Sequence, residues 1–376
     1  MAKKWLCPDQ VFDGQSLRRD MAVGLDDGMV SDLVPISEIP SGGQVRKVSG
    51  IIAPGYLDLQ VNGGGGVLLN NHPTVQAMQA IAAAHRVFGT VGVMPTVITD
   101  APVILARAVD AAVQAKGMAG VLGLHIEGPH ISLTRRGTHA AAFIRPMDAS
   151  TLAHIARLRD HGIAVMITLA PEMAEPGQIA QIVALGAVVS IGHSQATPDQ
   201  VAVALVEGAS CFTHLFNAMS PMLGRAAGVT GAAINSSAYC GFICDGQHVG
   251  DDMLGLAIRA RPLPDRMVLV SDAMATVGGP DQFQLYGKTI RLSAGRLIND
   301  EGSLAGANVT MAEGVARLIL RLKIPIETAL RMAISTPAAI VGKKNLANVV
   351  GRQMDDLIVL GKDCVPQRLR FDDITQ

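Results

Sequence analysis

The sequence has little net charge, few cysteines and no long hydrophobic run. Its 376 residues include 31 Lys and Arg against 32 Asp and Glu, which gives a net charge of -1. A chain so balanced has no bulk electrostatic field to attract nucleic acid or an anionic membrane surface, so any anionic ligand must be held locally. The apolar runs have strand length, and residues 1–10 contain no apolar stretch. We therefore expect no signal peptide, no membrane span and a cytoplasmic location.

Cysteine is too scarce and too scattered for a disulfide framework. The five cysteines, Cys7, Cys211, Cys240, Cys244 and Cys364, form no CxxC pair. This usage indicates a reducing compartment and argues against a thiolate metal cage. Cys240 and Cys244 have the spacing of a ligand pair, but both lie in an apolar run, so we expect them in the core.

Apolar residues and glycine, by contrast, are abundant, at 49% of the chain and 40 residues respectively. Short apolar, β-branched runs alternate with longer amphipathic runs, a rhythm typical of parallel strands joined by crossover helices. Counting the apolar runs gives eight strands, which favours an α/β fold with a (β/α)₈ TIM-like barrel. The eight expected strands cover residues 51–62, 89–98, 121–128, 163–171, 187–194, 211–217, 239–246 and 267–273.

The flanks differ from this middle part. Residues 1–50 and 343–376 carry short alternating segments, so we expect both ends to pair in one small β-sandwich domain beside a barrel of residues 51–342. Residues 283–304 read as a β-hairpin, either inserted into the barrel or belonging to the small domain. The alternating segments lie at 21–25, 29–34, 356–360 and 368–371. Helical spacing covers residues 73–88, 102–116, 149–161, 198–207 and 308–322.

Polar residues gather at the carboxyl ends of the expected strands, where barrel enzymes place their chemistry. The full set is Asp58, Gln60, Asn62, His125, Glu127, His193, His214, Asn217 and Asp272. A carboxylate and two imidazoles from three strands, Glu127, His193 and His214, form a three-ligand set that leaves a position open for water on a divalent cation. Each histidine alone is more often a hydrogen-bonded core residue, but three ligands at strand ends favour a metal site.

Asp272 ends the apolar run 267–272, where an ionised carboxylate has no packing role. A water activated by a cation needs a base, and a departing amine needs an acid, and Asp272 can serve as both. The alternative is a helix N-cap. The glycine run 63–66 lacks the lysine of a phosphate-binding loop and is interpreted as a turn.

Five stretches, in order along most of the chain, resemble the amidohydrolase superfamily and, within it, the N-acetylglucosamine-6-phosphate deacetylases. They are PGYLDLQVNG (54–63), LHIEGPH (124–130), IGHSQAT (191–197), THLFNAM (213–219) and LVSDA (269–273), with GSLAG (302–306) and STPA (335–338) adjoining. The resemblance implies that Glu127, His193 and His214 bind a catalytic metal. It also implies that Asp272 is the general base and acid and that His139 polarises the acetamide carbonyl.

For the amino-sugar phosphate, the resemblance implies a further group of contacts. Asn217 and Ala218 would bind through backbone amides, and Arg225 and His248 would bind the phosphate. The full implied set is Thr138, Asn217, Ala218, Arg225, His248, Leu304, Ala305 and Gly306. The resemblance also implies a homodimer in which His248 reaches the neighbouring subunit's site. Taken alone, Arg225 reads as an ordinary surface arginine.

One departure bears on the metal. Many superfamily members carry His-x-His on the first strand for a second metal, whereas this chain has Gln60 and Asn62, and residues 165–170 contain no lysine that could bridge two metals. We expect one divalent ion per subunit, zinc before iron, cobalt or manganese. The alternatives are a deacetylase for another N-acetylhexosamine phosphate such as the galactosamine epimer, a cyclic-amide hydrolase, or a non-catalytic scaffold.

Overall fold

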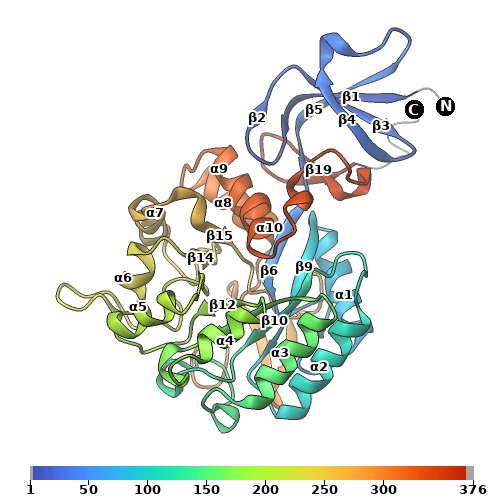
Figure 1. Ribbon diagram of the computed structural model, residues 1–376. Coiled ribbons are helices and arrows are strands. Elements are labelled where there is room, and N and C mark those ends of the chain that lie inside the picture. The colour runs from blue at the N-terminus through green and yellow to red at the C-terminus, as the bar shows by residue number, and fades with distance from the viewer. Residues whose placement is uncertain (1–2, 370–376) are drawn as a thin grey trace.

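Eight parallel strands form the central sheet of the protein, in the order β15-β14-β13-β12-β11-β10-β9-β6. A computed structural model describes residues 3–369, and Figure 1 shows helices arranged around this sheet. All eight expected strands are confirmed. They are β6 (Tyr56–Val61), β9 (Thr90–Ile98), β10 (Gly123–Glu127), β11 (Ala164–Leu169), β12 (Val188–Ile191), β13 (Cys211–Phe212), β14 (Tyr239–Phe242) and β15 (Met267–Leu269).

The sheet curls into a nearly closed barrel whose last gap lies between β6 and β15. Bonds at the carboxyl ends of these strands bridge that gap: Asp272 N–H donates to the Gln60 carbonyl at 3.0 Å, and Asn62 N–H donates to the Ala273 carbonyl at 2.9 Å. An isolated parallel bridge joins Val61 to Ala273. Closure therefore brings Gln60, Asn62 and Asp272 together at one end of the barrel.

Helices return the chain between strands, and several begin with a side-chain cap. Thr74 and Asp148 accept from backbone N–H groups in the first turns of α1 and α3, and Thr197 and Thr310 form capping boxes at α5 and α8. The five expected helices are confirmed. The helices are α1 (Val75–Arg86), α2 (Pro102–Gln114), α3 (Ala149–Asp160), α4 (Gln178–Ala184), α5 (Pro198–Val206), α6 (Gly228–Asn235), α7 (Asp251–Ala260), α8 (Met311–Leu320), α9 (Ile326–Leu330) and α10 (Thr336–Ile340).

Both ends of the chain meet in one seven-stranded sheet, with the order β20-β19-β5-β1-β3-β4 and β2 paired to β1. Strand β5 from the N-terminal part lies parallel to β1 and antiparallel to β19. This confirms the small β domain, which lies above the barrel in Figure 1. The strands are β1 (Lys4–Phe12), β2 (Leu17–Arg18), β3 (Met21–Asp26), β4 (Met29–Pro35), β5 (Gln44–Pro54), β19 (Leu357–Leu360) and β20 (Pro366–Arg368).

Two boundaries differ from expectation. The run 51–62 is two strands, because β5 continues to Pro54 in the small sheet and β6 starts the barrel at Tyr56. Gly55 separates them where a Cβ would lie 2.3 Å from the Val91 side chain, so only glycine fits the bend. The tail strand expected at 368–371 ends at Arg368, and residues 370–371 lie outside the described range.

Residues 283–304 belong to neither large sheet. They contribute to a separate antiparallel sheet of β16 (Gln282–Leu285), β17 (Lys288–Ser293) and β18 (Arg296–Ile298), which follows β15 in the chain. Its apolar side chains pack against Leu68, Ile98 and Met274. The glycine run is the expected turn, between β7 (Gly63–Gly64) and β8 (Val67–Leu68).

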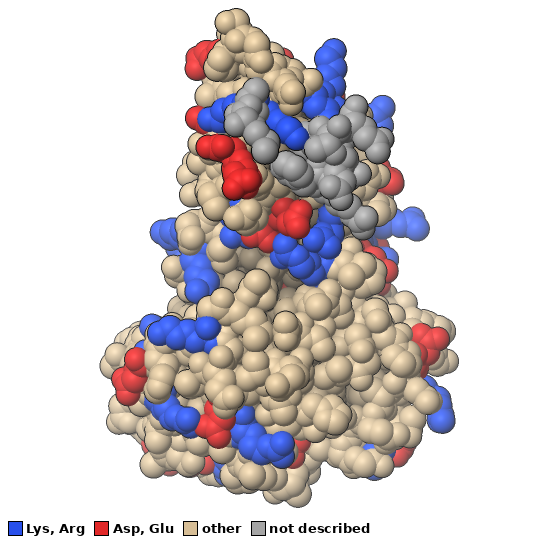
Figure 2. Space-filling view, turned by 90° about the vertical axis from the view of Figure 1, so that its right-hand side faces the viewer, with Lys and Arg blue, Asp and Glu red and all other residues tan. Residues whose placement is uncertain are grey.

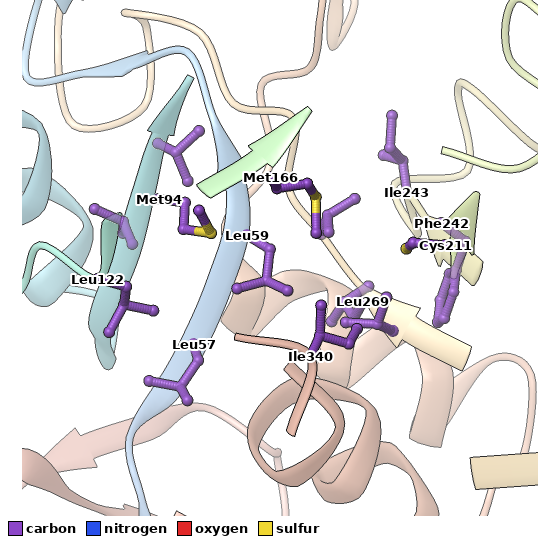
Figure 3. Packing of buried hydrophobic residues seen from close by; sticks show 14 of the residues in the cluster. Leu57, Leu59, Met94, Leu122, Met166, Cys211, Phe242, Ile243, Leu269 and Ile340 are labelled. Atoms are coloured by element: carbon purple, nitrogen blue, oxygen red, sulfur yellow. The ribbon is translucent and has the colours of Figure 1, made fainter. Parts of the chain in front are cut away.

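The main core lies inside the barrel and between the barrel and its helices. Leu57 and Leu59 from β6, Met166 from β11 and Leu269 from β15 belong to one cluster of buried residues, part of which Figure 3 shows. Cys240 and Cys244 are buried, as expected, and all five cysteines are free. Within residues 3–369, no helix is long and apolar enough to cross a membrane. Acidic and basic side chains are interspersed on the face that Figure 2 shows, which agrees with the balanced composition.

Candidate active site

The three predicted metal ligands meet at the carboxyl end of the barrel. Glu127 ends β10, and His193 and His214 lie in the loops after β12 and β13. Glu127 Oε1 lies 3.2 Å from His193 Nε2 and 3.0 Å from His214 Nε2, and the two Nε2 atoms are 3.0 Å apart. All three side chains are buried. The structure therefore brings together the ligand set that the strand ends predicted.

The chemistry of this triangle fits a divalent cation. His193 Nδ1 lies 2.9 Å from the Arg135 carbonyl oxygen, which only accepts, so Nδ1 is the donor and Nε2 is the ring nitrogen that can serve as a metal ligand. Burial acts to raise the pKa of Glu127, but its contacts with the His193 and His214 imidazoles hold that pKa well below its usual range. A buried carboxylate and an imidazole lone pair on one point match zinc-type ligation.

His139 lies beside this triangle. Its ring centroid is 4.5 Å from that of His193, and donor atoms of Glu127, His139 and His193 all lie within 4.8 Å of one another. Two ligand sets are thus geometrically possible. We favour Glu127, His193 and His214, because their atoms are mutually within 3.2 Å. Burial lowers the pKa of His139 to about 3, so its imidazole is neutral.

Asp272 follows β15 and lies against β6, the first strand of the barrel. Its Oδ1 accepts from Asn62 Nδ2 at 2.7 Å and from Gln60 Nε2 at 3.2 Å. Burial first, and then the charge of Glu127, raise the pKa of Asp272 to about 6. In the described chain no helix begins at Asp272, so the N-cap alternative is set aside.

The side-chain amides of Gln60 on β6 and of Asn62 just after it hold carboxylates in place. Gln60 Nε2 also donates to Glu127 Oε1 at 3.0 Å and thus bridges a predicted ligand and the predicted base. With their N–H groups turned to carboxylates, Gln60 and Asn62 act as donors here. Their amide nitrogens offer no lone pair to a second metal.

Left-handed backbone conformations gather at the site. His193, His214, Ala218 and Asp272 have φ values of 47°, 31°, 51° and 51°. Each costs about 1–3 kcal/mol in a residue other than glycine, and such strain persists only where surrounding contacts hold it. The loops after the strands thus turn sharply enough to aim these side chains into the barrel mouth.

A cavity of about 340 Å³ opens over these groups. Asn217 and Ala218 reach it from the loop after β13, and Leu304 and Gly306 from the segment after β18, whereas Ala305 is buried behind the wall. The predicted residues on the wall are Asn62, Glu127, Thr138, His139, His193, His214, Asn217, Ala218, His248, Asp272, Leu304 and Gly306.

The two predicted phosphate contacts lie in different places. His248 lines the cavity of its own chain, where Asp245 Oδ2 lies 2.7 Å from His248 Nδ1. Within one chain His248 thus lies on its own cavity, and its expected reach into a neighbouring subunit's site stays a prediction. Arg225 is exposed on the loop 221–227 and does not line this cavity.

Sequence reasoning missed two residues that support the site. Thr99 Oγ1 lies 2.7 Å from His139 Nδ1, and the Tyr286 hydroxyl donates to the Thr99 carbonyl. Thr99 directly follows β9, so the strand-end rule that found Glu127 also points to it. Tyr286 lies on the β16–β17 turn, and no local signal relates that turn to the barrel mouth.

A larger cavity, of about 720 Å³, lies at the opposite end of the barrel, beneath the small β domain. Charged residues on its wall form ion pairs with one another, since Arg86 and Arg352 both contact Asp356. The smaller cavity is the candidate active site because it contains the predicted ligands and Asp272.

Comparisons with known proteins agree with this geometry. No protein-family model matches the chain. The N-acetylgalactosamine-6-phosphate deacetylase of Shewanella sp. is 37% identical over 94% of this chain and 91% of its own length, and the N-acetylglucosamine-6-phosphate deacetylase of Haemophilus influenzae is 31% identical over 88% of each.

Solved structures give the same picture over the whole chain. The N-acetylglucosamine-6-phosphate deacetylase of Pasteurella multocida superposes with a TM-score of 0.89 at 31% identity, and that of Mycobacterium smegmatis with 0.86 at 29%, each over 97% of both chains. The chain therefore belongs to the N-acetylglucosamine-6-phosphate deacetylase family of the amidohydrolase superfamily.

Proposed function

We propose that this protein hydrolyses the acetamide of N-acetylglucosamine 6-phosphate to glucosamine 6-phosphate and acetate, in amino-sugar catabolism or recycling. The observation that carries the proposal is the Glu127, His193 and His214 triangle beside Asp272 in one cavity. Family membership supplies the substrate class. Because the predicted ligands and base lie together, the chain has what a catalyst needs, and the non-catalytic scaffold loses its support.

One divalent cation per subunit, with zinc first and iron, cobalt or manganese as alternatives, fits the ligand set of Glu127, His193 and His214. When bound, such a cation lowers the pKa of water and polarises a carbonyl. The donor roles of Gln60 and Asn62 support a single ion, since both amides offer N–H groups to carboxylates.

Asp272 is the proposed proton carrier. As a carboxylate it accepts a proton from the attacking water, and as an acid it returns that proton to the leaving sugar nitrogen. A pKa near 6 suits both steps at neutral pH, because the group is mostly ionised yet remains a competent acid. Gln60 and Asn62 keep Oδ1 fixed while the proton moves.

His139 is the proposed hydrogen-bond donor to the acetamide oxygen. The neutral imidazole lies beside the ligand triangle, so it can face a carbonyl that approaches the same point. A preorganised donor in a buried site stabilises the negative charge that develops on that oxygen.

For the phosphate we propose His248 together with the backbone amides at Asn217 and Ala218, all on the cavity wall. Arg225 is exposed and lies off its own cavity, so in the homodimer that we propose it is Arg225 that serves the neighbouring site. Thr138, Leu304 and Gly306 complete the proposed sugar contacts, with Ala305 supporting them from behind. A cytoplasmic location is consistent with five free cysteines.

The second candidate substrate is N-acetylgalactosamine 6-phosphate. It is favoured by the higher identity to the Shewanella enzyme, 37% against 31% for the Haemophilus one. The two sugars differ at one hydroxyl, so the same ligands and base would serve either.

The deciding experiment measures acetate release by purified protein from both 6-phosphates and from unphosphorylated N-acetylglucosamine, before and after chelation. We expect release that needs the phosphate and the metal, with the preferred epimer showing the higher kcat/KM. Asp281→Asn, an exposed carboxylate outside the cavity, is the control for variants at Asp272. Metal-bound, folded protein that releases no acetate from either phosphate would contradict the proposal.

A further inference from the structure

We propose that Thr99 is a positioning residue that holds the neutral His139 imidazole with its proton on Nε2. The inference rests on the proposed function, because it specifies how His139 can donate to the substrate carbonyl. A neutral imidazole has one N–H, and the partner of the other nitrogen decides which nitrogen bears it. The donor role requires that proton on the nitrogen that faces the substrate.

The Thr99 hydroxyl has one good partner. Its Oγ1 lies 2.7 Å from His139 Nδ1, and its next acceptor, the Glu127 carbonyl oxygen, is at 3.5 Å, the limit for a hydrogen bond. A hydroxyl that donates to Nδ1 makes the short bond and leaves Nε2 protonated. If His139 Nδ1 bore the proton instead, the Thr99 hydroxyl hydrogen would have only the 3.5 Å contact with the Glu127 carbonyl oxygen.

Packing fixes this hydroxyl from two sides. Thr99 is 1% exposed, and a Cβ at Gly128 would lie 2.2 Å from its Oγ1, so glycine at 128, with φ +79°, leaves the room that the hydroxyl occupies. The Tyr286 hydroxyl donates to the Thr99 carbonyl from the β16–β17 turn. Side chain and main chain of Thr99 are therefore both anchored.

The choice of tautomer has a second consequence. With its proton on Nδ1, His139 would have a free lone pair on Nε2 and could compete as a ligand, since one of its ring nitrogens lies within 4.8 Å of the ligand atoms of Glu127 and His193. With its proton on Nε2, His139 cannot coordinate and remains a donor. Thr99 thus separates the ligand role from the donor role among adjacent histidines.

The direct test is ¹⁵N NMR of histidine-labelled protein, with the His139 signals assigned by comparison with His139→Gln. In the wild type and in Thr99→Ser, we expect a protonated Nε2 and an unprotonated Nδ1 that accepts a hydrogen bond. In Thr99→Val, which keeps the shape but removes the hydroxyl, we expect the Nδ1-protonated form to appear. Wild-type protein with a protonated Nδ1 overturns the inference without any variant.

Kinetics provide the matched test. Thr99→Val should lower kcat by up to about 1000-fold, since outright loss of an oxyanion donor costs about 100- to 1000-fold, with KM changed less than about threefold. Thr99→Ser should restore most of kcat. Thr90→Val is the control, because Thr90 is a buried threonine on β9, the strand that Thr99 follows, and its hydroxyl has no partner among the described residues.

The outcomes separate this inference from the proposed function. Wild-type kcat in folded Thr99→Val, or no recovery in Thr99→Ser, overturns the role of Thr99 even if the enzyme is a deacetylase. If the protein deacetylates neither sugar phosphate, the proposed function fails while the NMR still decides the tautomer. If Thr99→Val does not fold, the wild-type and Thr99→Ser spectra still show which nitrogen of His139 bears the proton.

Discussion

The Asn62 side-chain amide donates a hydrogen bond of 2.7 Å to the Asp272 carboxylate. This bond favours the ionised form and partly offsets the burial that raises the pKa of Asp272 to about 6. The two residues follow the first and last barrel strands, β6 and β15, so barrel closure contributes to the protonation of the proposed base.

Asn62→Ala should therefore move the acidic limb of the kcat/KM profile upward. Wild-type activity should fall as the pH drops through about 6 or somewhat below, since a bound cation lowers the pKa further. Loss of the donor should shift this limb up by about one pH unit. Asn348→Ala, at an exposed position outside the cavity, should leave the profile unchanged. If the acidic limb does not shift in Asn62→Ala, the titration seen in the kcat/KM profile does not belong to Asp272.

Asp272→Asn should abolish most activity without weakening the fold. We expect kcat to fall by about 100- to 10,000-fold, the range for removal of a general acid–base group. The amide removes a charge that Glu127 repels, so the melting temperature should stay constant or rise. Calorimetry and metal analysis beside the kinetics check this, and a variant that loses its metal would point to a ligand role for Asp272.

Metal removal should lower both activity and stability. Without a cation, the Glu127 carboxylate and the neighbouring Nε2 atoms lose the partner that their geometry fits. A ligand held by the native state at 100 times its Kd stabilises by about 2.7 kcal/mol, so a chelated sample should melt at lower temperature. Elemental analysis should find one metal ion per wild-type chain and almost none in His214→Ala. Two equivalents in the wild type would contradict the single site.

Asp58→Asn should flatten the pH dependence of stability. Asp58 is fully buried, accepts from the Gln60 and Ser271 backbone, and has its pKa raised by burial from 3.8 to about 7. Because the folded state holds the proton more tightly, the contribution of Asp58 to stability is full below pH 4 and is lost as the pH rises through about 7. At pH 8 the variant should be more stable by about 1–3 kcal/mol. Urea unfolding at pH 5 and pH 8 measures this, and an equal gain at both would contradict it.

Mixed subunits can test the homodimer. Arg225→Ala should raise KM for the phosphorylated sugar at least about tenfold, since it removes a charge-assisted phosphate contact. If Arg225 serves the neighbouring site, unfolding and refolding Arg225→Ala together with inactive Asp272→Asn should restore sites with wild-type KM. Failure to restore them, or a monomer by light scattering, would place Arg225 outside catalysis.

Much of this site could be predicted because barrels place chemistry at strand ends. Glu127, His193, His214 and Asp272 are polar residues that end apolar runs, and the structure brings all four together. The expected helices had amphipathic spacing and capping residues. By contrast, α6 is apolar around most of its surface and contains two glycines, so periodicity did not reveal it.

The remainder depended on tertiary structure. The β5–β6 break at Gly55 lies within one apolar run, and only the contact with Val91 shows why the chain bends there. Whether His248 or Arg225 stays in its own cavity depends on a contact with Asp245 and on a loop direction. Neither can be read from residue type.

The pairing of β5 with β19 has a consequence for biosynthesis. Strand β19 follows β5 only after the whole barrel, so this edge of β5 remains open until the barrel has been synthesised. Such a late, long-range pairing slows folding and leaves a template for association with other nascent chains. Shortening the chain before β19 should therefore cause aggregation during expression, although every proposed ligand would still be present.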